Sequence, residues 1–163
     1  GGLTAGLLAA ELPGLFKQMV MVGIPALGLF EKTLPMRGMT PNMDEQQQRA
    51  VHRHNLVSMM FSHESSASEE VIDLQIHNVS RDRLRKRRIA RTDVLLGLQD
   101  RWAYPVHGIW GAKDALYKST LERVPQVLHR LDSFQVVPDA GHWVMFEKPD
   151  AFHALVDKLL VKK

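Results

Sequence analysis

Apolar residues form short runs and helical stripes toward the two ends of the chain. Residues 2–12 (GLTAGLLAAEL) are good helix formers, and the pair Pro13-Gly14 stops them. The run from Met19 to Gly23 is continuously apolar, which is typical of a strand buried on both faces of a parallel sheet. A helix, a tight turn and a buried strand together predict a β/α layout.

The same alternation returns after residue 101. Residues 104–111 (YPVHGIWG) predict a strand, residues 115–131 predict helix on either side of Pro125, and residues 133–142 predict a strand that runs into a loop. Residues 147–160 predict an amphipathic closing helix. Its apolar face holds Phe152, Leu155, Val156, Leu159 and Leu160.

The middle of the chain, residues 31–100, is more polar and richer in Met and His. Ser68 and the two glutamates after it predict an N-cap and the acidic first turn of a helix that continues past Val71. A further helix is expected over 82–98, and no segment here predicts a strand. We therefore expect an α/β core formed by residues 1–30 and 101–163, with residues 31–100 inserted as a helical cap.

Composition is that of a globular domain. The chain has 163 residues, of which 45% are hydrophobic and 24% charged. It contains no cysteine, which excludes disulfides and thiolate catalysis. The opening segment has no basic n-region, and Glu11, Pro13, Lys17 and Pro25 keep any apolar run below the ~20 residues that a bilayer requires. We expect a soluble, cytoplasmic protein without a membrane anchor.

Two loops hold the candidate chemistry, and each follows a predicted strand. The first is W-G-x-x-D, which ends at Asp114, and the second is A-G-H-W, which contains His142. Adjacent parallel strands would bring these two side chains together at the carboxyl edge of the sheet. A buried carboxylate that orients an imidazole is the acid–base half of a catalytic triad.

These motifs, with F-E-K-P after the histidine and G-G-L-T-A-G-L-L-A-A at the start, resemble the second half of the α/β-hydrolase family. The resemblance implies about three parallel strands with flanking helices and a helical cap, catalytic roles for Asp114 and His142, and no cofactor. The family's nucleophile elbow is G-x-S-x-G, and Gly1 and Gly2 resemble its end. The serine would then lie two positions before Gly1, so this chain alone should be close to inactive. Thr4 also fits G-x-T-x-G, but no strand precedes it, and a helical threonine is the better interpretation.

The cap is expected to choose the substrate. The sequences A-G-H-W and N-L-V-S-M-M-F resemble hydrolases that cleave carbon–carbon bonds of aromatic meta-cleavage products, although Gln75 stands where that subgroup has an arginine. Esterase, lactonase, haloperoxidase-like and C–C hydrolase activities all stay open. We expect a small-molecule substrate bound by Trp143, Met59, Met60 and Gln75. Further candidates for an apolar pocket are Met36, Met39, Met43 and Phe61.

Three other features bear on partners. The basic run 81–91 (RDRLRKRRIAR) suggests an alternative function, a helical module that binds nucleic acid or a protein. It has no interleaved aromatic residues, so a solvated cap helix is favoured and nucleic acid is not an expected partner. His52 and His54 have no nearby acid and His63 has only Glu64, which is too little for a metal site, so no metal is expected. The strand at 19–23 should have an unpaired edge, which predicts association with a missing N-terminal half of the fold or with a second copy.

Overall fold

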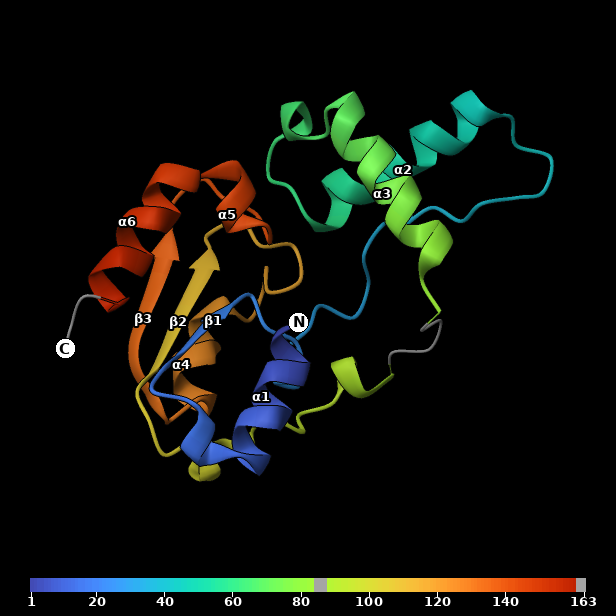
Figure 1. Cartoon of the computed structure of the whole chain (residues 1–163). Helices are drawn as coiled ribbons and strands as arrows, with labels where there is room; N and C mark the ends of the chain where they lie inside the picture. Colours follow the sequence, from blue (N-terminus) through green and yellow to red (C-terminus); the bar gives the residue numbers. More distant parts are fainter. Residues whose placement is uncertain (84–87, 161–163) are drawn as a thin grey trace.

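The computed structural model describes residues 1–83 and 88–160. Three parallel strands form one sheet in the order β1-β2-β3 (Figure 1), with bounds Met19–Val22, Val106–Gly111 and Leu131–Val137. All three strands and their parallel orientation were predicted from the sequence. The registers pair Val22 with Ile109 and Gly111 with Val137, so the strands end near one another at one edge of the sheet.

Helices cover both faces of this sheet. Val20 and Val22 pack on one face with α6, Pro149–Leu160, while Met19 and Met21 pack on the other with α1, Gly2–Glu11. The short helices are α4, Val124–Val127, and α5, Val144–Glu147. The largest side chains of the core, Trp102 and Trp110, are fully buried, and the Trp102 indole N–H donates to the carbonyl of Gly6 in α1.

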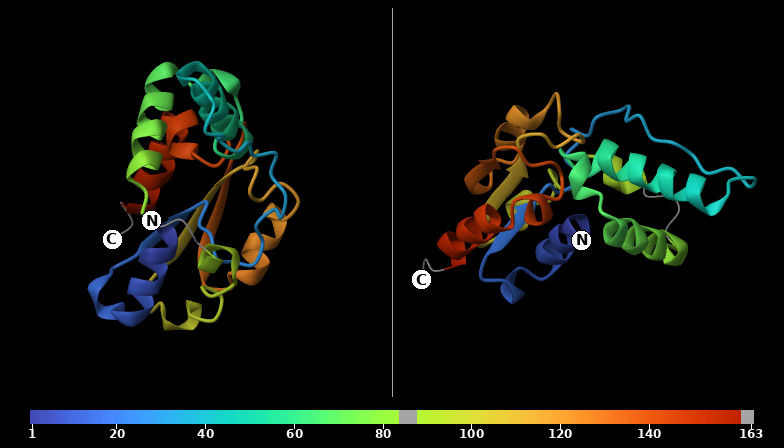
Figure 2. Two further views of the ribbon diagram at one scale, coloured as in Figure 1. Left: turned by 90° about the vertical axis from the view of Figure 1, so that its right-hand side faces the viewer. Right: turned by 90° about the horizontal axis from the view of Figure 1, so that it is seen from above.

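Two longer helices form a separate layer beyond the strand tips (Figures 1 and 2). They are α2, Glu45–Met59, and α3, Glu69–Arg81. Asp44 caps α2 in a capping box with Gln47, and Ser68 caps α3 as the sequence predicts. This layer has its own small apolar cluster, which consists of Leu56, Phe61, Ala67, Val71 and Ile72. The division of the chain into core and cap stays a prediction.

The helix predicted over 82–98 is wrong for the part that the structure describes. Arg88–Arg91 is a single 3-10 turn, and residues 92–98 form further turns. The carbonyls of Ala90 and Thr92 accept hydrogen bonds from the loop after β1, at Ala26 and Gly28. Because these carbonyls bind the core, they are not available for a helical ladder. Residues 84–87 of the same prediction lie outside the described residues.

The helical stretch predicted on both sides of Pro125 is also wrong. Residues before it form turns and the 3-10 turn Leu121–Arg123, and α4 begins one residue before the proline. Proline has no N–H and is tolerated only in the first helical turn, so the helix starts there. The closing helix forms as predicted from Pro149 onward, and α5 is a separate short helix before it.

Among residues 1–83 and 88–160, no helix combines the length and apolar character needed to cross a bilayer.

Candidate active site

The predicted acid and imidazole lie together at the carboxyl edge of the sheet. Asp114 follows β2 and His142 follows β3, and the distance from His142 Nδ1 to Asp114 Oδ2 is 2.8 Å. An ionised carboxylate only accepts hydrogen bonds, so Nδ1 carries the proton and Nε2 keeps a free lone pair. This tautomer is the one that a general base requires.

The Asp114 carboxylate is fully enclosed by protein. Its side chain is 0% exposed, and its second oxygen, Oδ1, accepts the backbone N–H of Leu116 at 2.9 Å. A buried carboxylate is stable only when its oxygens have such donors. The His142 side chain is 17% exposed, so the imidazole connects the buried acid with the space beside it.

Gly23, directly after β1, completes the floor of this site. Its φ is +53°, and a Cβ atom placed on it would lie 2.9 Å from His142 Cε1 and Nδ1. Only glycine combines this backbone conformation with such a close approach to the imidazole. Sequence reasoning missed this role, although a glycine that ends an apolar strand run was a usable signal.

Tyr117 supports the loop that follows Gly23. Its buried hydroxyl donates a hydrogen bond to the carbonyl of Ile24. Burial raises the pKa of the Tyr117 hydroxyl far above its ordinary range, and the nearby charge of Asp114 raises it further. The phenol therefore stays protonated and keeps its donor role at all physiological pH values.

A cavity of about 820 Å³ opens beside His142. Of the residues predicted to bind substrate, Met59, Met60 and Trp143 line this cavity, as does Met36. The remaining lining includes Gly1, Gly2, Ile24, Phe30, Lys32, Thr33 and Arg91. The cavity thus combines apolar walls with a few polar groups, as binding sites for small molecules generally do.

The other predicted pocket residues lie elsewhere. Gln75 lines a smaller cavity of about 240 Å³ within the helical layer, which it shares with Met39 and which adjoins the larger one at Met36, Met59 and Met60. Met43 lines neither of these two cavities. Phe61 is buried and packs edge-on against Trp143, so it supports the wall without forming its surface. Thr4 is exposed on α1 and is absent from the lining of the cavity beside His142.

A group of charged side chains ties the loops around the site together. Asp139 binds Lys113 Nζ at 2.6 Å, Lys148 Nζ at 2.8 Å and His63 Nε2 at 3.0 Å. The hydrogen bonds from Lys113 and Lys148 hold the pKa of the Asp139 carboxyl well below its usual range. These contacts join the loops after β2 and β3 with the segment that connects α2 and α3.

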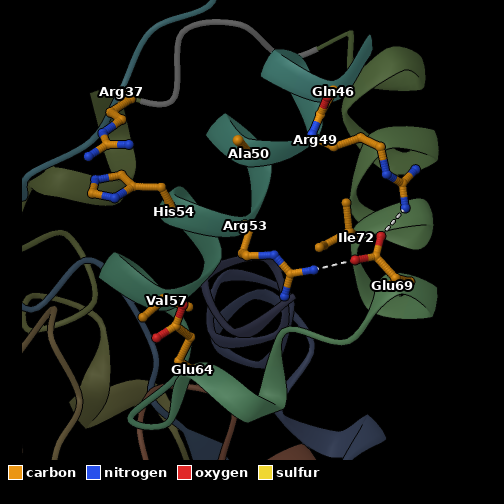
Figure 3. A pocket seen from close by; sticks show the side chains of 10 residues that line it. All are labelled: Arg37, Gln46, Arg49, Ala50, Arg53, His54, Val57, Glu64, Glu69 and Ile72. Atoms are coloured by element: carbon orange, nitrogen blue, oxygen red, sulfur yellow. Dashed lines mark hydrogen bonds and ion pairs between the residues drawn. The ribbon is translucent and has the colours of Figure 1, made fainter.

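A second cavity, of about 590 Å³, lies between α2 and α3 (Figure 3). Of the three arginines in its lining, two form ion pairs: Arg49 with Glu69 and Asp73, and Arg53 with Glu69. His54 Nε2 lies 2.6 Å from the carbonyl of Pro35, while His52 is buried, and this burial lowers the pKa of the His52 imidazole. Within the described ranges, no three His, Cys, Asp or Glu side chains are grouped to hold a metal ion.

The basic run 81–91 lies partly outside the described residues, at 84–87. Of its described members, Arg88 and Arg91 are exposed in the 3-10 turn, and Arg91 lines the cavity beside His142. Its role as a nucleic-acid or protein-binding module stays a prediction.

Comparison with solved structures identifies the fold. A variant of the meta-cleavage product hydrolase CumD from Pseudomonas fluorescens matches 98% of this chain and 61% of its own length, with 17% identity and a TM-score of 0.66. The hydrolase of 2-hydroxy-6-oxo-6-phenylhexa-2,4-dienoate from a Rhodococcus strain matches 98% of this chain and 60% of its own, with 18% identity and a TM-score of 0.60. A carboxylesterase from Nitrososphaera gargenis matches 98% and 61%, with 16% identity and a TM-score of 0.59.

The chain therefore has an α/β-hydrolase fold and spans about three fifths of the length of these structures. The fold class expected from the sequence, three parallel strands of an open sheet with flanking helices, is confirmed. No protein-family model matches the sequence, and comparison with curated proteins finds no match.

Proposed function

We propose that this chain carries the acid and the base of a serine-type α/β-hydrolase that cleaves ester or carbon–carbon bonds in a small, partly apolar substrate. The observation that carries the proposal is the 2.8 Å hydrogen bond between His142 Nδ1 and the buried Asp114 carboxylate, beside a cavity of about 820 Å³. Solved structures of the same fold are named as meta-cleavage product hydrolases and as carboxylesterases, and both bond types are included for that reason.

In the proposed mechanism, His142 Nε2 takes the proton of a hydroxyl nucleophile as its oxygen attacks the substrate carbonyl. The imidazolium that forms is stabilised by Asp114 and returns the proton to the leaving group. A water molecule, deprotonated by the same nitrogen, then releases the acyl group. The buried carboxylate keeps Nδ1 protonated throughout, so Nε2 is always the nitrogen that exchanges the proton.

We further propose that the hydroxyl belongs to sequence that precedes Gly1. Gly1 and Gly2 line the same cavity as His142, so a residue joined to Gly1 would emerge beside the imidazole. Thr33 is the one hydroxyl side chain in that lining among the described residues, and it makes no hydrogen bond with His142. If Gly1 and Gly2 end the nucleophile elbow, as the family resemblance implies, the serine is proposed to lie two positions before Gly1.

The apolar part of the substrate is proposed to lie against Met59, Met60 and Trp143. These residues line the cavity on the side of the helical layer, next to the smaller cavity that contains Gln75. A longer substrate would reach Gln75. No cofactor is part of the proposal, because acyl transfer by this pair needs only proton transfer and a hydroxyl.

The test adds the proposed serine. A short extension, Gly-Ala-Ser-Ala, is joined to Gly1 and compared with Gly-Ala-Ala-Ala and with the unextended chain. We expect the serine extension alone to release p-nitrophenol from p-nitrophenyl acetate in a burst, the sign of an acyl-enzyme. His142→Gln in the extended chain should abolish the burst. Equal turnover by all three chains would contradict the missing nucleophile, and a burst that survives His142→Gln would contradict the base.

We also propose that β1 pairs with a further strand, supplied by the rest of the fold or by a second copy. The sheet order gives β1 only one neighbour among the described strands, and open strand edges invite pairing. Leu8, Leu12 and Leu15, in and just after α1, are 43%, 50% and 67% exposed, which adds apolar surface to the helix that packs on this strand's face of the sheet. Light scattering should show a dimer or larger species, and a monomer at all concentrations would contradict this proposal.

A further inference from the structure

Two segments far apart in the sequence meet directly behind His142. One is the link between α2 and α3, residues 60–66, and the other is the loop 140–147. The backbone N–H of Trp143 donates to the carbonyl of Met60 at 3.0 Å, and a Cβ atom on Gly141 would lie 2.7 Å from Ser62 N. The segments therefore touch backbone to backbone, at the residues on either side of the imidazole.

The Glu147 carboxylate occupies the centre of this contact and accepts hydrogen bonds from five donors. Oε2 accepts the backbone N–H of Gly141 at 2.6 Å. Oε1 accepts the N–H of Ser62 at 2.8 Å and that of His63 at 3.0 Å. The remaining two donors are the hydroxyls of Ser66, at 3.0 Å, and Ser62, at 3.2 Å.

The backbone donors of the two segments bind different carboxylate oxygens, and the Ser62 hydroxyl lies 3.2 Å from both of them. Gly141 N–H is held by Oε2 alone, while both backbone donors of the 60–66 segment are held by Oε1. Among the described residues, no Lys, Arg or His forms an ion pair with Glu147, so N–H and O–H dipoles alone stabilise its charge. Because a carboxylate is one rigid plane, displacement of either segment is passed to the other.

We propose that Glu147 is a positioning residue that couples the place of the His142 imidazole to the helical layer carrying Met59 and Met60. The coupling acts through Gly141, whose N–H it holds one residue before His142. Its significance for catalysis rests on the proposed function, but the coupling itself is a property of the fold. It makes the pocket wall and the base a single unit, so a substrate that displaces the wall also displaces the imidazole.

The sharpest test perturbs the far side of the carboxylate and measures the imidazole. Ser66→Ala removes a donor to Oε1 and touches nothing on the His142 side, while Ser65→Ala is a matched control because Ser65 makes no side-chain hydrogen bond. The readout is the solvent exchange of the His142 Nδ1 proton, observed by NMR and assigned by its loss in His142→Gln. We expect Ser66→Ala to speed this exchange by about tenfold, the effect of one net hydrogen bond on local opening, and Ser65→Ala to leave it unchanged.

A second variant tests the carboxylate itself. In Glu147→Gln one of the two oxygens becomes an NH₂ group, which faces either Gly141 N–H or the N–H groups of Ser62 and His63 and leaves them without an acceptor. We expect the Nδ1 proton of His142 to broaden or exchange rapidly while the rest of the spectrum stays folded. Asp150→Asn, an exposed acid without a side-chain partner, is the control.

The proposal is overturned if Ser66→Ala and Glu147→Gln change only the amide resonances of residues 60–66 and the His142 Nδ1 proton exchanges as in the unmodified chain. Glu147 would then hold the helical layer to the loop 140–147 without affecting the position of the imidazole. Should Glu147→Gln fail to fold, the Ser66→Ala comparison decides alone. None of these measurements needs turnover, so a failed esterase assay with the serine extension would count against the proposed function and not against the coupling.

Discussion

Two carboxylates of this molecule, one at the edge of the sheet and one in the helical layer, each bind two donors but have opposite surroundings. Asp114 accepts hydrogen bonds from His142 and Leu116 and its side chain is 0% exposed. Glu69 accepts from Arg49, at 2.5 Å, and from Arg53, and its side chain is 66% exposed. The shorter contacts belong to the exposed acid, where water competes for every partner and salt screens the attraction. We therefore expect burial, rather than distance, to decide which carboxylate contributes more to the stability of the fold.

The largest effect should come from the buried acid. Asp114→Asn can turn its amide NH₂ toward Nδ1 of the His142 ring, and a donor at this place favours the tautomer with the proton on Nε2. We expect a loss of about 1–3 kcal/mol in the free energy of unfolding. In the serine-extended chain, turnover should fall by about 10⁴-fold. Urea unfolding and p-nitrophenyl acetate assays measure the two, and unchanged turnover would show that His142 does not depend on this acid.

A somewhat smaller effect is expected at the floor of the same site. Gly23→Ala forces a side chain into a backbone conformation with φ of +53° and toward the imidazole, at 2.9 Å. We expect a loss of about 1–3 kcal/mol in unfolding free energy, mostly backbone strain, together with a displaced His142 Nδ1 proton resonance. Gly14→Ala is the matched control, because a Cβ atom there meets nothing within 4 Å. Equal losses in both variants would mean that the imidazole is not in contact with Gly23.

The third effect depends on pH and concerns Asp139, whose side chain is more exposed than that of Asp114 and less exposed than that of Glu69. Hydrogen bonds from Lys113 and Lys148 lower the pKa of Asp139, so its contribution to stability is present above the ordinary carboxyl pKa of about 4 and is lost as the pH falls toward the lowered value. Asp139→Asn should therefore be less stable than the unmodified chain at pH 6, and the difference should shrink as the pH falls below about 4. Urea unfolding over this range measures it, with Asp150→Asn as control. A difference that grows at low pH would contradict the sign.

The smallest effect is expected in the helical layer. Glu69→Gln removes the charge that Arg49 and Arg53 share, yet all three groups remain in contact with water. The melting temperature should change little, and the change should vanish in high salt. A loss of stability as large as that of Asp114→Asn would show that the contribution of these contacts to stability follows their distance and not their burial.

The sequence predicted the strands best, because apolar segments bounded by glycine or proline point to one kind of structure. A continuous apolar run predicted the first strand, and short segments bounded by proline or glycine predicted the other two. Because parallel strands share a carboxyl edge, the meeting of Asp114 and His142 followed. Residues 88–98 were harder to predict, because the apolar spacing there fits a helix while the carbonyls of Ala90 and Thr92 bind the loop after β1. Local pattern carries no information about a distant competing partner.

Within the site, the residues that sequence reasoning missed act through contacts between distant segments. Gly23 follows a strand and Glu147 belongs to the F-E-K-P segment, but neither position says in a single sequence what its residue contacts. Their roles depend on what lies opposite, at His142 and at Ser62. Trp143 was found because it follows the motif histidine, and Met59 and Met60 because they stand in the cap sequence N-L-V-S-M-M-F. Met43 was misplaced because nothing local in the sequence separates a methionine of the pocket from one outside it.

The pairing of β1 with β2 extends over only four residues, and the register of this short pairing determines which residue lies next to His142. If β1 slipped by one position along β2, the residue beneath the imidazole would be Val22 or Ile24 in place of a glycine, and the branched side chain would collide with the ring. Slippage would also exchange the inward and outward side chains of the strand between the two helical layers. The register of β1 thus determines whether the His142 imidazole has space to reach the Asp114 carboxylate.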